Sequence, residues 1–281
     1  MKQHPYIKNL TQIKTILANA LKEDIGSGDI TAKLTIPIQQ KAQAQIIAKQ
    51  NGVLAGSAFI KMLFIRLDPE TKIKFLVKEG NYFNKGAKIA VINGKTRILL
   101  TGERTALNIL CRLSGIATLT RKFVDQIAHT SAKILDTRKT TPNLRILEKY
   151  AVKIGGGYNH RFGLYDMILI KDNHIKAAGG IINAIIQAQK GLKVIEVETK
   201  NLAEVKQALS LKVPIIMLDN MSLNQIRQAV KLVKGKAKLE VSGGVNLKTV
   251  KKIAETGVDY ISVGAITHSA PIIDLSMKIV N

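Results

Sequence analysis

Short runs of aliphatic and β-branched residues recur along the second part of the chain, and each run has the length of a single buried strand. The stretches between the runs are long enough for one helix each. The runs are centred near Leu135, Ile168, Ile195, Ile216, Leu239 and Ile261. This alternation of strand and helix predicts a parallel sheet with right-handed crossover connections.

Helix-capping signals lie in the intervals between these runs. Ser222 and Gln225 form a capping box ahead of apolar residues at helical spacing. Pro142, after Thr141, is typical of the first residue of a helix. Asn246 is an N-cap candidate for a helix that ends near Gly257. These signals predict helices between the strands, as a parallel sheet requires.

The end of the first predicted strand favours a closed sheet over an open one. An open doubly wound sheet usually carries a glycine-rich fingerprint in its first strand-to-helix turn. Residues 136–140 read Asp-Thr-Arg-Lys-Thr instead. Repeated units with buried strands fit a barrel. We therefore expect an α/β protein whose residues 105–281 form an incomplete TIM-like α/β barrel.

Residues 1–104 have a different pattern. Apolar residues between positions 13 and 21 recur at helical spacing and predict an amphipathic helix. Short alternating segments follow, and the pairs Asn51-Gly52 and Asn93-Gly94 are typical of hairpin turns. We expect an N-terminal α/β sandwich domain with an antiparallel sheet, onto which the C-terminal segment of the barrel domain is free to pack back.

Composition limits the core, the membrane and the redox setting. Hydrophobic residues make up 46% of the chain, aromatic residues only 4%, and tryptophan is absent, so the core must be aliphatic. The single Cys111 forms neither an internal disulfide nor a cysteine metal cluster, which favours a cytoplasmic setting. No apolar run approaches the ~18 residues typical of a membrane helix. The amphipathic N-terminal helix is not typical of a secretion signal.

The net charge is unusual, because 43 Lys and Arg against 20 Asp and Glu give +23. Three interpretations compete: a lysine-rich surface without a specific role, an enzyme whose substrates are phosphates and carboxylates, and a nucleic-acid-binding protein. Basic residues never occur more than two in a row, and no aromatic RNA-binding motif is present. Nucleic acid is therefore the weakest of the three interpretations.

Charged residues and glycines directly follow the predicted strands. In an α/β barrel these strand ends meet on one face, where active sites are built. Basic residues come first and suit carboxylates or phosphates, and the two carboxylates that follow suit ribose hydroxyls or Mg²⁺. Glycines end the last two strands, as at barrel phosphate sites. The strand-end residues are Arg138, Lys139, Lys171, Asp172, Glu198, Asp219, Ser242, Gly243, Gly244, Gly264 and Ala265. All of them except Asp172, together with the neighbouring Thr137 and Val263, are candidate site residues.

A polar loop between the first two predicted strands adds two candidates. Glycines at positions 155–157 end a helix and give the loop flexibility. His160 and Arg161 follow them. The loop therefore brings one titratable group and one permanently charged group to the predicted cation pocket.

Three motifs are specific: DTRKTTP at residues 136–142, GGGYNHR at 155–161 and LIKDNH at 169–174. Further matches span nearly the whole chain, at residues 23–31, 103–108, 149–152, 196–198, 217–220 and 241–244. Together these motifs resemble those of quinolinate phosphoribosyltransferase, the carboxylating nicotinate-nucleotide pyrophosphorylase. Two positions depart from the family: Asn143 stands where the family commonly has glycine, and Cys111 lies in an otherwise family-like helix.

The resemblance implies an N-terminal sandwich followed by a barrel, assembled as a homodimer or a higher multiple. It implies that quinolinate and phosphoribosyl pyrophosphate, with Mg²⁺, give nicotinate mononucleotide, CO₂ and pyrophosphate in NAD biosynthesis. It also implies that Arg104 is donated across the subunit interface to the partner's site.

The implied site divides between the two substrates. Arginine suits bidentate carboxylate recognition, and the expected quinolinate anchors are Arg104, Arg138 and Arg161, with Lys139, His160 and Lys171 beside them. The expected ligands of the ribose hydroxyls, directly or through Mg²⁺, are Glu198 and Asp219. A lysine near the departing carboxylate would assist decarboxylation. The residues expected to be catalytic are Lys139, Lys171, Glu198 and Asp219.

Two other functions compete with this one. A molybdenum-transport-associated paralogue of the family shares part of the pattern, but the complete motifs at residues 171–174 and 196–198 argue against it. A basic nucleic-acid-binding protein would use the +23 charge. We expect neither nucleic acid nor a membrane as a partner.

Overall fold

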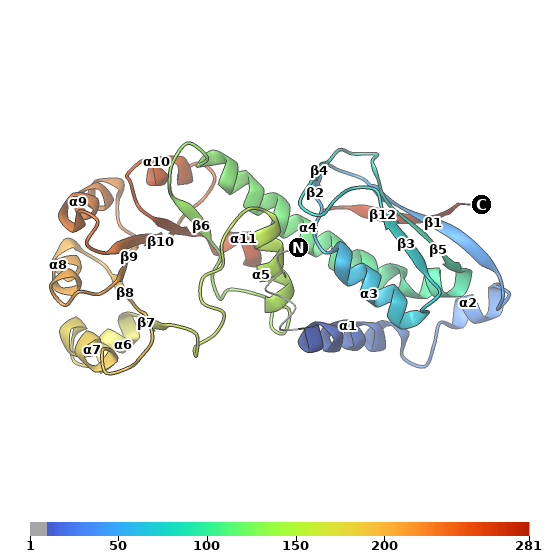
Figure 1. Ribbon diagram of the computed structural model, residues 1–281, viewed down its shortest axis with the longest axis horizontal. Helices are drawn as coiled ribbons and strands as arrows, with labels where there is room; N and C mark the ends of the chain where they lie inside the picture. The colour runs from blue at the N-terminus through green and yellow to red at the C-terminus, as the bar shows by residue number, and fades with distance from the viewer. Residues whose placement is uncertain (1–9, 281) are drawn as a thin grey trace. The chain divides into compact units, whose positions relative to one another are not determined.

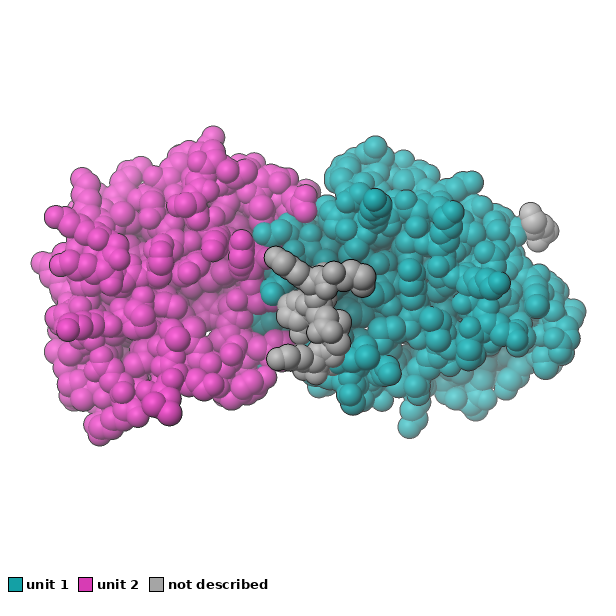
Figure 2. Space-filling model, viewed as in Figure 1, with its two compact units in different colours: residues 1–119, 141–156, 270–281 teal, residues 120–140, 157–269 magenta. Residues whose placement is uncertain are grey.

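The computed structural model describes residues 10–280, which form two compact units (Figure 2). Of the described residues, unit 1 comprises 10–119, Thr141–Gly156 and 270–280, and unit 2 comprises Thr120–Thr140 and Gly157–Ser269. We expected a domain boundary after residue 104, but this position lies inside the unbroken helix α4 (Thr96–Gln126), and unit 1 passes into unit 2 further along the same helix, after Leu119. An unbroken helix offers no composition shift or turn signal, so the sequence pattern does not show where unit 1 ends.

Unit 1 contains a four-stranded antiparallel sheet in the order β12-β1-β5-β3 (Figure 1). Its strands are β1 (Lys41–Ala48), β3 (Lys72–Phe75), β5 (Lys88–Lys95) and β12 (Leu275–Val280). The short strands β2 (Gly52–Val53) and β4 (Tyr82–Phe83) form a separate antiparallel pair. Strand β12 comes from the end of the chain and pairs with β1. The C-terminal segment therefore completes the N-terminal sheet.

The described part of unit 1 also contains five helical segments. They are α1 (Leu10–Ile25), α2 (Ile30–Thr35), α3 (Ser57–Leu67), the first part of α4, and α5 (Arg145–Ile154). Of these, α1, α3 and α4 pack an apolar core against the sheet. The amphipathic helix predicted from the sequence is confirmed as α1, which buries Ile13, Leu17 and Leu21 on one face. The fully buried core residues from the sheet, α3 and α4 include Ile46, Ile89, Ile92, Ile60, Leu63, Phe64, Leu99 and Leu110.

Both predicted hairpin turns are wrong. Asn93 and Gly94 lie within β5, where they pair with residues of β1. Gly52 begins β2, which pairs with β4 and not with the preceding strand. Asn-Gly favours a two-residue hairpin because both residues tolerate positive φ. None of these four residues has a positive φ, so pairing with distant strands overrides the local turn signal.

Helix α5 begins later than the sequence predicts, at Arg145 and not at Pro142. Asn143 has a φ of 65°, a left-handed conformation that an α-helix does not contain. Asparagine tolerates this conformation better than most residues, so Asn143 keeps a turn suited to glycine. Buried Glu148 holds the turn, because its carboxylate accepts hydrogen bonds from the Thr141 hydroxyl at 2.8 Å and from Arg112 Nη2 of α4 at 2.8 Å.

Unit 2 is built on a six-stranded parallel sheet in the order β6-β11-β10-β9-β8-β7. The strands are β6 (Lys133–Leu135), β7 (Ile168–Ile170), β8 (Ile195–Thr199), β9 (Ile215–Asp219), β10 (Lys238–Ser242) and β11 (Tyr260–Ser262). Each strand contains one of the predicted apolar runs. In the described part of the chain, the edge strands β6 and β7 do not pair with each other. The sheet thus has the parallel order and the gap expected of an incomplete barrel.

Helices connect these strands, and α7 (Ile181–Ala188), α8 (Leu202–Ser210) and α9 (Leu223–Val233) lie on the outer side of the sheet (Figure 1). The other connecting helices are α6 (Asp172–Ala177) and α10 (Val250–Ala254), and α11 (Ala265–His268) follows the last strand of this sheet, β11. The capping box of α9 is confirmed, with reciprocal bonds between Ser222 and Gln225. Helix α10 starts at Val250 because a separate turn precedes it, in which Thr249 N donates to Asn246 O. Among residues 10–280, no helix has the length and apolar character needed to cross a membrane.

Candidate active site

The carboxyl ends of the unit 2 strands surround a cavity of about 800 Å³. All the residues predicted for the site except Arg104 line it. These residues are Thr137, Arg138, Lys139, His160, Arg161, Lys171, Glu198, Asp219, Ser242, Gly243, Gly244, Val263, Gly264 and Ala265. Arg104 is exposed on α4 and belongs to unit 1. The parallel sheet brings the other residues together because all its strands end at the same edge.

The loop after β6 presents the first cations. Lys139 N donates to the Thr137 hydroxyl at 3.1 Å, and Thr140 N donates to Arg138 O at 2.9 Å, so the loop folds on itself. The Thr267 hydroxyl of α11 donates to Lys139 O at 2.8 Å and holds the loop. Two long basic side chains, those of Arg138 and Lys139, therefore extend from a fixed backbone into the cavity.

An ion pair joins the ends of β7 and β8. Lys171 Nζ lies 3.0 Å from Glu198 Oε2, and the Lys171 side chain is 45% exposed whereas that of Glu198 is 10% exposed. The two charges offset each other within the protein. An incoming anion can compete for Lys171, and a hydroxyl or a cation can compete for Glu198.

The end of β9 combines Asp219 with a residue that the strand-end pattern missed. Asn220 donates from Nδ2 to Asp219 Oδ2 at 2.9 Å, and its backbone N donates to Ser242 O at 2.9 Å. Asn220 directly follows Asp219 in a motif quoted for the family resemblance, which is the signal that points to it. The other cavity residues that we did not predict are Leu169, Met217, Val245, Ser262 and His268.

Glycine is required after β10 because of this asparagine. Gly243 has a φ of 95°, and a Cβ atom at this position would collide with the side-chain amide of Asn220. Gly244 also has a positive φ, of 61°. A side chain at either position would strain the loop, and one at Gly243 would also displace Asn220 from Asp219.

The loop that carries His160 and Arg161 is anchored to buried Asp136. Asn159 Nδ2 donates to Asp136 Oδ2 at 2.6 Å, and His160 N donates to Asp136 Oδ1 at 2.9 Å. Arg161 is 8% exposed, and its Nη1 donates to Met167 O at 3.0 Å. Burial, and then the positive charge of Arg138, lower the pKa of Arg161.

Two buried glutamates lie against His160, and the sequence analysis did not assign either to the site. His160 Nε2 is 2.9 Å from Glu196 Oε2 and 3.6 Å from Glu240 Oε1. Burial raises the pKa of Glu196 to about 7 and that of Glu240 to about 8. The signal that could have found them is a single carboxylate inside an apolar strand run, which must find a buried partner.

A Glu240→Gln variant should lose less stability than the natural protein as the pH rises. The folded protein keeps a proton on Glu240 up to about pH 8, whereas the unfolded chain releases it above about pH 4.5. The stabilisation of the folded protein by this proton is therefore complete below about pH 4.5 and is lost as the pH rises through about 8. We expect the free energy of unfolding to fall between about pH 5 and pH 9 by roughly 1–3 kcal/mol more in the natural protein than in the variant. Urea unfolding at both pH values measures this, and parallel curves would contradict it.

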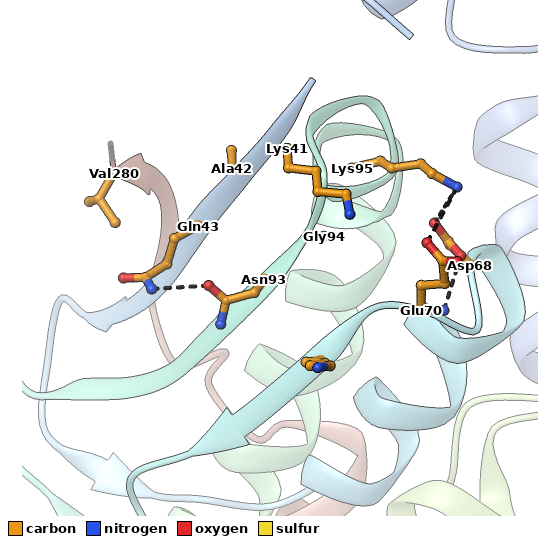
Figure 3. Close-up of a pocket in the computed structure, with 10 residues that line it drawn as sticks. Lys41, Ala42, Gln43, Asp68, Glu70, Asn93, Gly94, Lys95 and Val280 are labelled. Carbon is orange, nitrogen blue, oxygen red and sulfur yellow. Dashed lines mark hydrogen bonds and ion pairs between the residues drawn. The ribbon is translucent and has the colours of Figure 1, made fainter. Parts of the chain in front are cut away.

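A second concave surface lies on the sheet of unit 1 and has a volume of about 590 Å³ (Figure 3). Its charged groups pair with each other: Lys95 Nζ lies 3.2 Å from Asp68 Oδ2 and 3.9 Å from Glu70 Oε2. Gln43 Nε2 donates to Asn93 Oδ1 at 3.0 Å across the neighbouring strands. None of the residues predicted for the site lines this surface. The cavity of unit 2 is therefore the better candidate.

Comparison with known proteins places this geometry in a family. Residues 116–278 match the C-terminal domain of quinolinate phosphoribosyl transferase, and residues 29–114 match its N-terminal domain. The chain belongs to the quinolinate phosphoribosyltransferase family. The junction of these two matches lies inside α4, as does the passage from unit 1 to unit 2.

Curated quinolinate phosphoribosyltransferase relatives cover nearly the whole chain. The chloroplastic nicotinate-nucleotide pyrophosphorylase (carboxylating) of Arabidopsis thaliana is 44% identical in an alignment of 289 positions that covers 95% of this chain and 82% of that protein. The probable nicotinate-nucleotide pyrophosphorylase of Bacillus subtilis is 44% identical over 274 residues, 96% of this chain and 94% of that protein. The family resemblance drawn from the sequence motifs is confirmed.

Solved structures of the quinolinate phosphoribosyltransferase family agree with the fold. The nicotinate-nucleotide pyrophosphorylase from Francisella tularensis is 42% identical and superposes with a TM-score of 0.90, covering 96% of each chain. NadC from Streptococcus pyogenes is 42% identical and superposes with a TM-score of 0.93, covering 100% of each chain. The expected fold class, an antiparallel N-terminal sheet domain and a parallel α/β domain, is confirmed.

Proposed function

We propose that the chain is a decarboxylating quinolinate phosphoribosyltransferase, a pentosyltransferase of NAD biosynthesis. It transfers phosphoribosyl from phosphoribosyl pyrophosphate to quinolinate and releases CO₂ and pyrophosphate. One observation carries the proposal: cations, carboxylates and glycine-rich strand ends line a single cavity of a chain 44% identical to carboxylating nicotinate-nucleotide pyrophosphorylases.

The basic wall of the cavity suits quinolinate, which carries two adjacent carboxylates. Arg138 and Arg161 offer planar guanidinium groups that bind carboxylates in a bidentate manner. Lys139 and Lys171 add point charges beside them. Four cations around one small dianion orient its ring and hold the ring nitrogen toward the second substrate.

The other wall suits phosphoribosyl pyrophosphate. Gly243, Gly244 and Gly264 leave backbone N–H groups accessible to phosphate oxygens. Glu198 and Asp219, at the ends of the paired strands β8 and β9, can accept hydrogen bonds from ribose hydroxyls.

The donor set of Glu198 and Asp219 also fits Mg²⁺, a hard cation that prefers carboxylate oxygens. Glu198 contacts Lys171 through Oε2, and Asp219 contacts Asn220 through Oδ2, so each carboxylate engages the protein through one oxygen. When bound, Mg²⁺ would neutralise charge on the pyrophosphate. These two residues would hold it, directly or through the substrate.

The reaction needs no protein nucleophile. The quinolinate nitrogen attacks the anomeric carbon of the ribose, the bond from that carbon to pyrophosphate breaks, and positive charge that develops on the sugar is stabilised by Glu198 and Asp219. The carboxylate next to the ring nitrogen then leaves as CO₂, and a proton takes its place. Lys139 and Lys171 both line the cavity, and one of them would stabilise the departing carboxylate. Catalysis is mostly positioning and electrostatics.

We further propose that the enzyme works as a homodimer or a multiple of it. Arg104 is exposed on α4 in unit 1 and does not line the cavity of unit 2, whereas every other predicted site residue does. An exposed arginine in a motif of the family is free to enter the site of a partner subunit.

Release of CO₂ tests the proposed function. Purified protein should release labelled CO₂ from quinolinate labelled at the carboxylate next to the nitrogen, and only when phosphoribosyl pyrophosphate is present. Chelation of divalent cations should abolish the release, and added Mg²⁺ should restore it. A folded protein that binds nucleic acid but releases no CO₂ would favour the basic nucleic-acid-binding alternative.

Glu198→Gln and Asp219→Asn variants should lose the use of phosphoribosyl pyrophosphate more than the binding of quinolinate. Each change removes a negative charge and keeps the side-chain shape, so the expected loss in kcat/KM is about a hundredfold or more. Calorimetry with each substrate separately measures the two affinities. An equal loss for both substrates would point to a structural role for these carboxylates.

A further inference from the structure

His160, which lines the cavity, forms a buried cluster with Glu196 and Glu240 behind it, and the proposed reaction does not use these two carboxyl groups directly. The side chain of His160 is 8% exposed, and those of Glu196 and Glu240 are 0% and 2% exposed. The hydroxyl of Ser262 donates to Glu240 Oε1 at 2.5 Å. His160 and Glu240 lie against the Glu196 carboxyl, and the charges of Arg161, Lys171 and Glu198 also act on it.

The hydrogen bonds of the ring show which nitrogen of His160 carries the proton. The backbone N of Arg161 donates to His160 Nδ1 at 2.7 Å. A nitrogen that accepts a hydrogen bond must be unprotonated, so the proton of the ring is on Nε2. Nε2 faces the two carboxyl groups, at 2.9 Å and 3.6 Å. His160 is therefore a neutral imidazole whose protonated Nε2 lies 2.9 Å from Glu196 Oε2.

A metal ion is the alternative occupant of such a cluster, because one ligand atom from each of these three residues lies within 4.8 Å of the others. A metal bound to Nε2 of a neutral imidazole requires the proton on Nδ1. That proton would face the backbone N–H of Arg161, 2.7 Å away, where two hydrogens would collide. The contact with Arg161 therefore argues against metal binding.

Space on both sides of the loop explains why polar contacts must hold it. His160 and Arg161 line the cavity of the candidate active site and also a second cavity of about 280 Å³. The 280 Å³ cavity is lined by residues at the amino ends of the unit 2 strands, among them Lys133, Ile215 and Tyr260. Side chains between two cavities have fewer packing contacts to fix them.

We propose that Glu196 and Glu240 are positioning residues that hold His160 as the Nε2-protonated neutral tautomer and, through Nδ1, fix Arg161 for quinolinate. The effect on quinolinate rests on the proposed function, whereas the tautomer does not. The carboxyl pair faces the protonated Nε2 of the ring on one side, and the Arg161 backbone donates to Nδ1 on the other. His160 accordingly orients the cation pocket and adds no positive charge to it, unlike the role that the sequence suggested.

Nitrogen-15 NMR of the histidine rings tests the tautomer without any substrate. The chain has five histidines, and a His160→Gln variant identifies the ring signals of His160. In metal-free protein at neutral pH, we expect Nε2 to be protonated and Nδ1 to be a bare acceptor. A ring protonated on Nδ1 or on both nitrogens would overturn the proposal. Displacement of the His160 signals by zinc chloride alone would also overturn it, in favour of a metal site.

Substitutions at Glu196 and Glu240 test the effect on the substrate. Glu196→Gln and Glu240→Gln keep an oxygen acceptor, so the KM for quinolinate should stay within about threefold of the natural value. Glu196→Met keeps the approximate side-chain volume but removes the acceptor, so this KM should rise about tenfold or more while the KM for phosphoribosyl pyrophosphate is unchanged.

Thr199→Val is the matched control for general damage to the sheet. Thr199 is fully buried on the same strand as Glu196, and its hydroxyl donates to Met217 O at 2.9 Å, outside the cluster. The control should lower the melting temperature without a selective change in KM. Glu196→Met with an unchanged quinolinate KM, or with equal changes for both substrates, would reject the positioning role. If Glu196→Met fails to fold, the nitrogen-15 NMR of His160 alone tests the proposal. That measurement needs no substrate, so it stays valid even if the natural protein shows no turnover.

Discussion

Mixing an Arg104→Ala variant with a Lys171→Ala variant should restore an activity that neither variant has alone. Lys171 lines the cavity of its own unit 2, whereas Arg104 lies on α4 in unit 1 and does not line it. If Arg104 serves the partner's site, a mixed dimer contains one site with both defects and one site with neither. Each mixed dimer should therefore have about half of the activity of a natural dimer.

The matched control mixes Lys171→Ala with Glu198→Gln. Both residues line the same cavity and form an ion pair at 3.0 Å, so every site of a mixed dimer keeps one defect and activity should stay absent. Subunit exchange is verified by mass spectrometry of differently tagged subunits. Confirmed exchange without recovery in the first mixture would show that Arg104 does not act across the interface.

Arg138→Ala should weaken quinolinate binding by about tenfold to a hundredfold, because one charge-assisted bidentate contact contributes roughly 1.5–3 kcal/mol. Arg138 is exposed at the end of β6, so its removal should leave the melting temperature nearly unchanged. Arg138→Lys keeps the charge but not the planar fork, and its affinity should lie between those of the natural protein and the alanine variant. Calorimetry with quinolinate alone measures all three.

Arg227→Ala is the control for the loss of one positive charge. Arg227 is exposed on the outer helix α9 and does not line the cavity. In a chain of net charge +23, a general field effect on a dianion would appear in both variants and would weaken as salt is added. Equal losses for Arg138→Ala and Arg227→Ala would remove Arg138 from the quinolinate site.

The sequence was sufficient for the strands of unit 2 and for most of the candidate site. Buried parallel strands appear as short apolar runs, and the barrel geometry places whatever follows them on one face. Lys171, Glu198 and Asp219 could therefore be selected from position alone, before any family resemblance was considered. Local signals with one physical meaning, such as the capping box at Ser222, also predicted their element correctly.

Long-range pairing was beyond the sequence pattern. Asn93-Gly94 reads as a turn when only its neighbours are considered, yet it pairs with β1 inside a sheet that β12 completes from the end of the chain. The unbroken helix α4 likewise hides the passage from one unit to the next. Local preferences contribute less free energy than burial of whole strands, so tertiary pairing prevails where the two conflict.

By itself, the sequence determined which strand ends carry cations, carboxylates and glycines, because those positions depend only on the order of residues along each strand and on the parallel arrangement. Only the tertiary structure showed that Glu196 and Glu240 meet His160, since three residues on separate segments become neighbours only when the strands pair. The protonation of that cluster is likewise a tertiary property. It follows from burial, which raises the pKa of both carboxyl groups, and from the Arg161 backbone, which fixes the proton of His160 on Nε2.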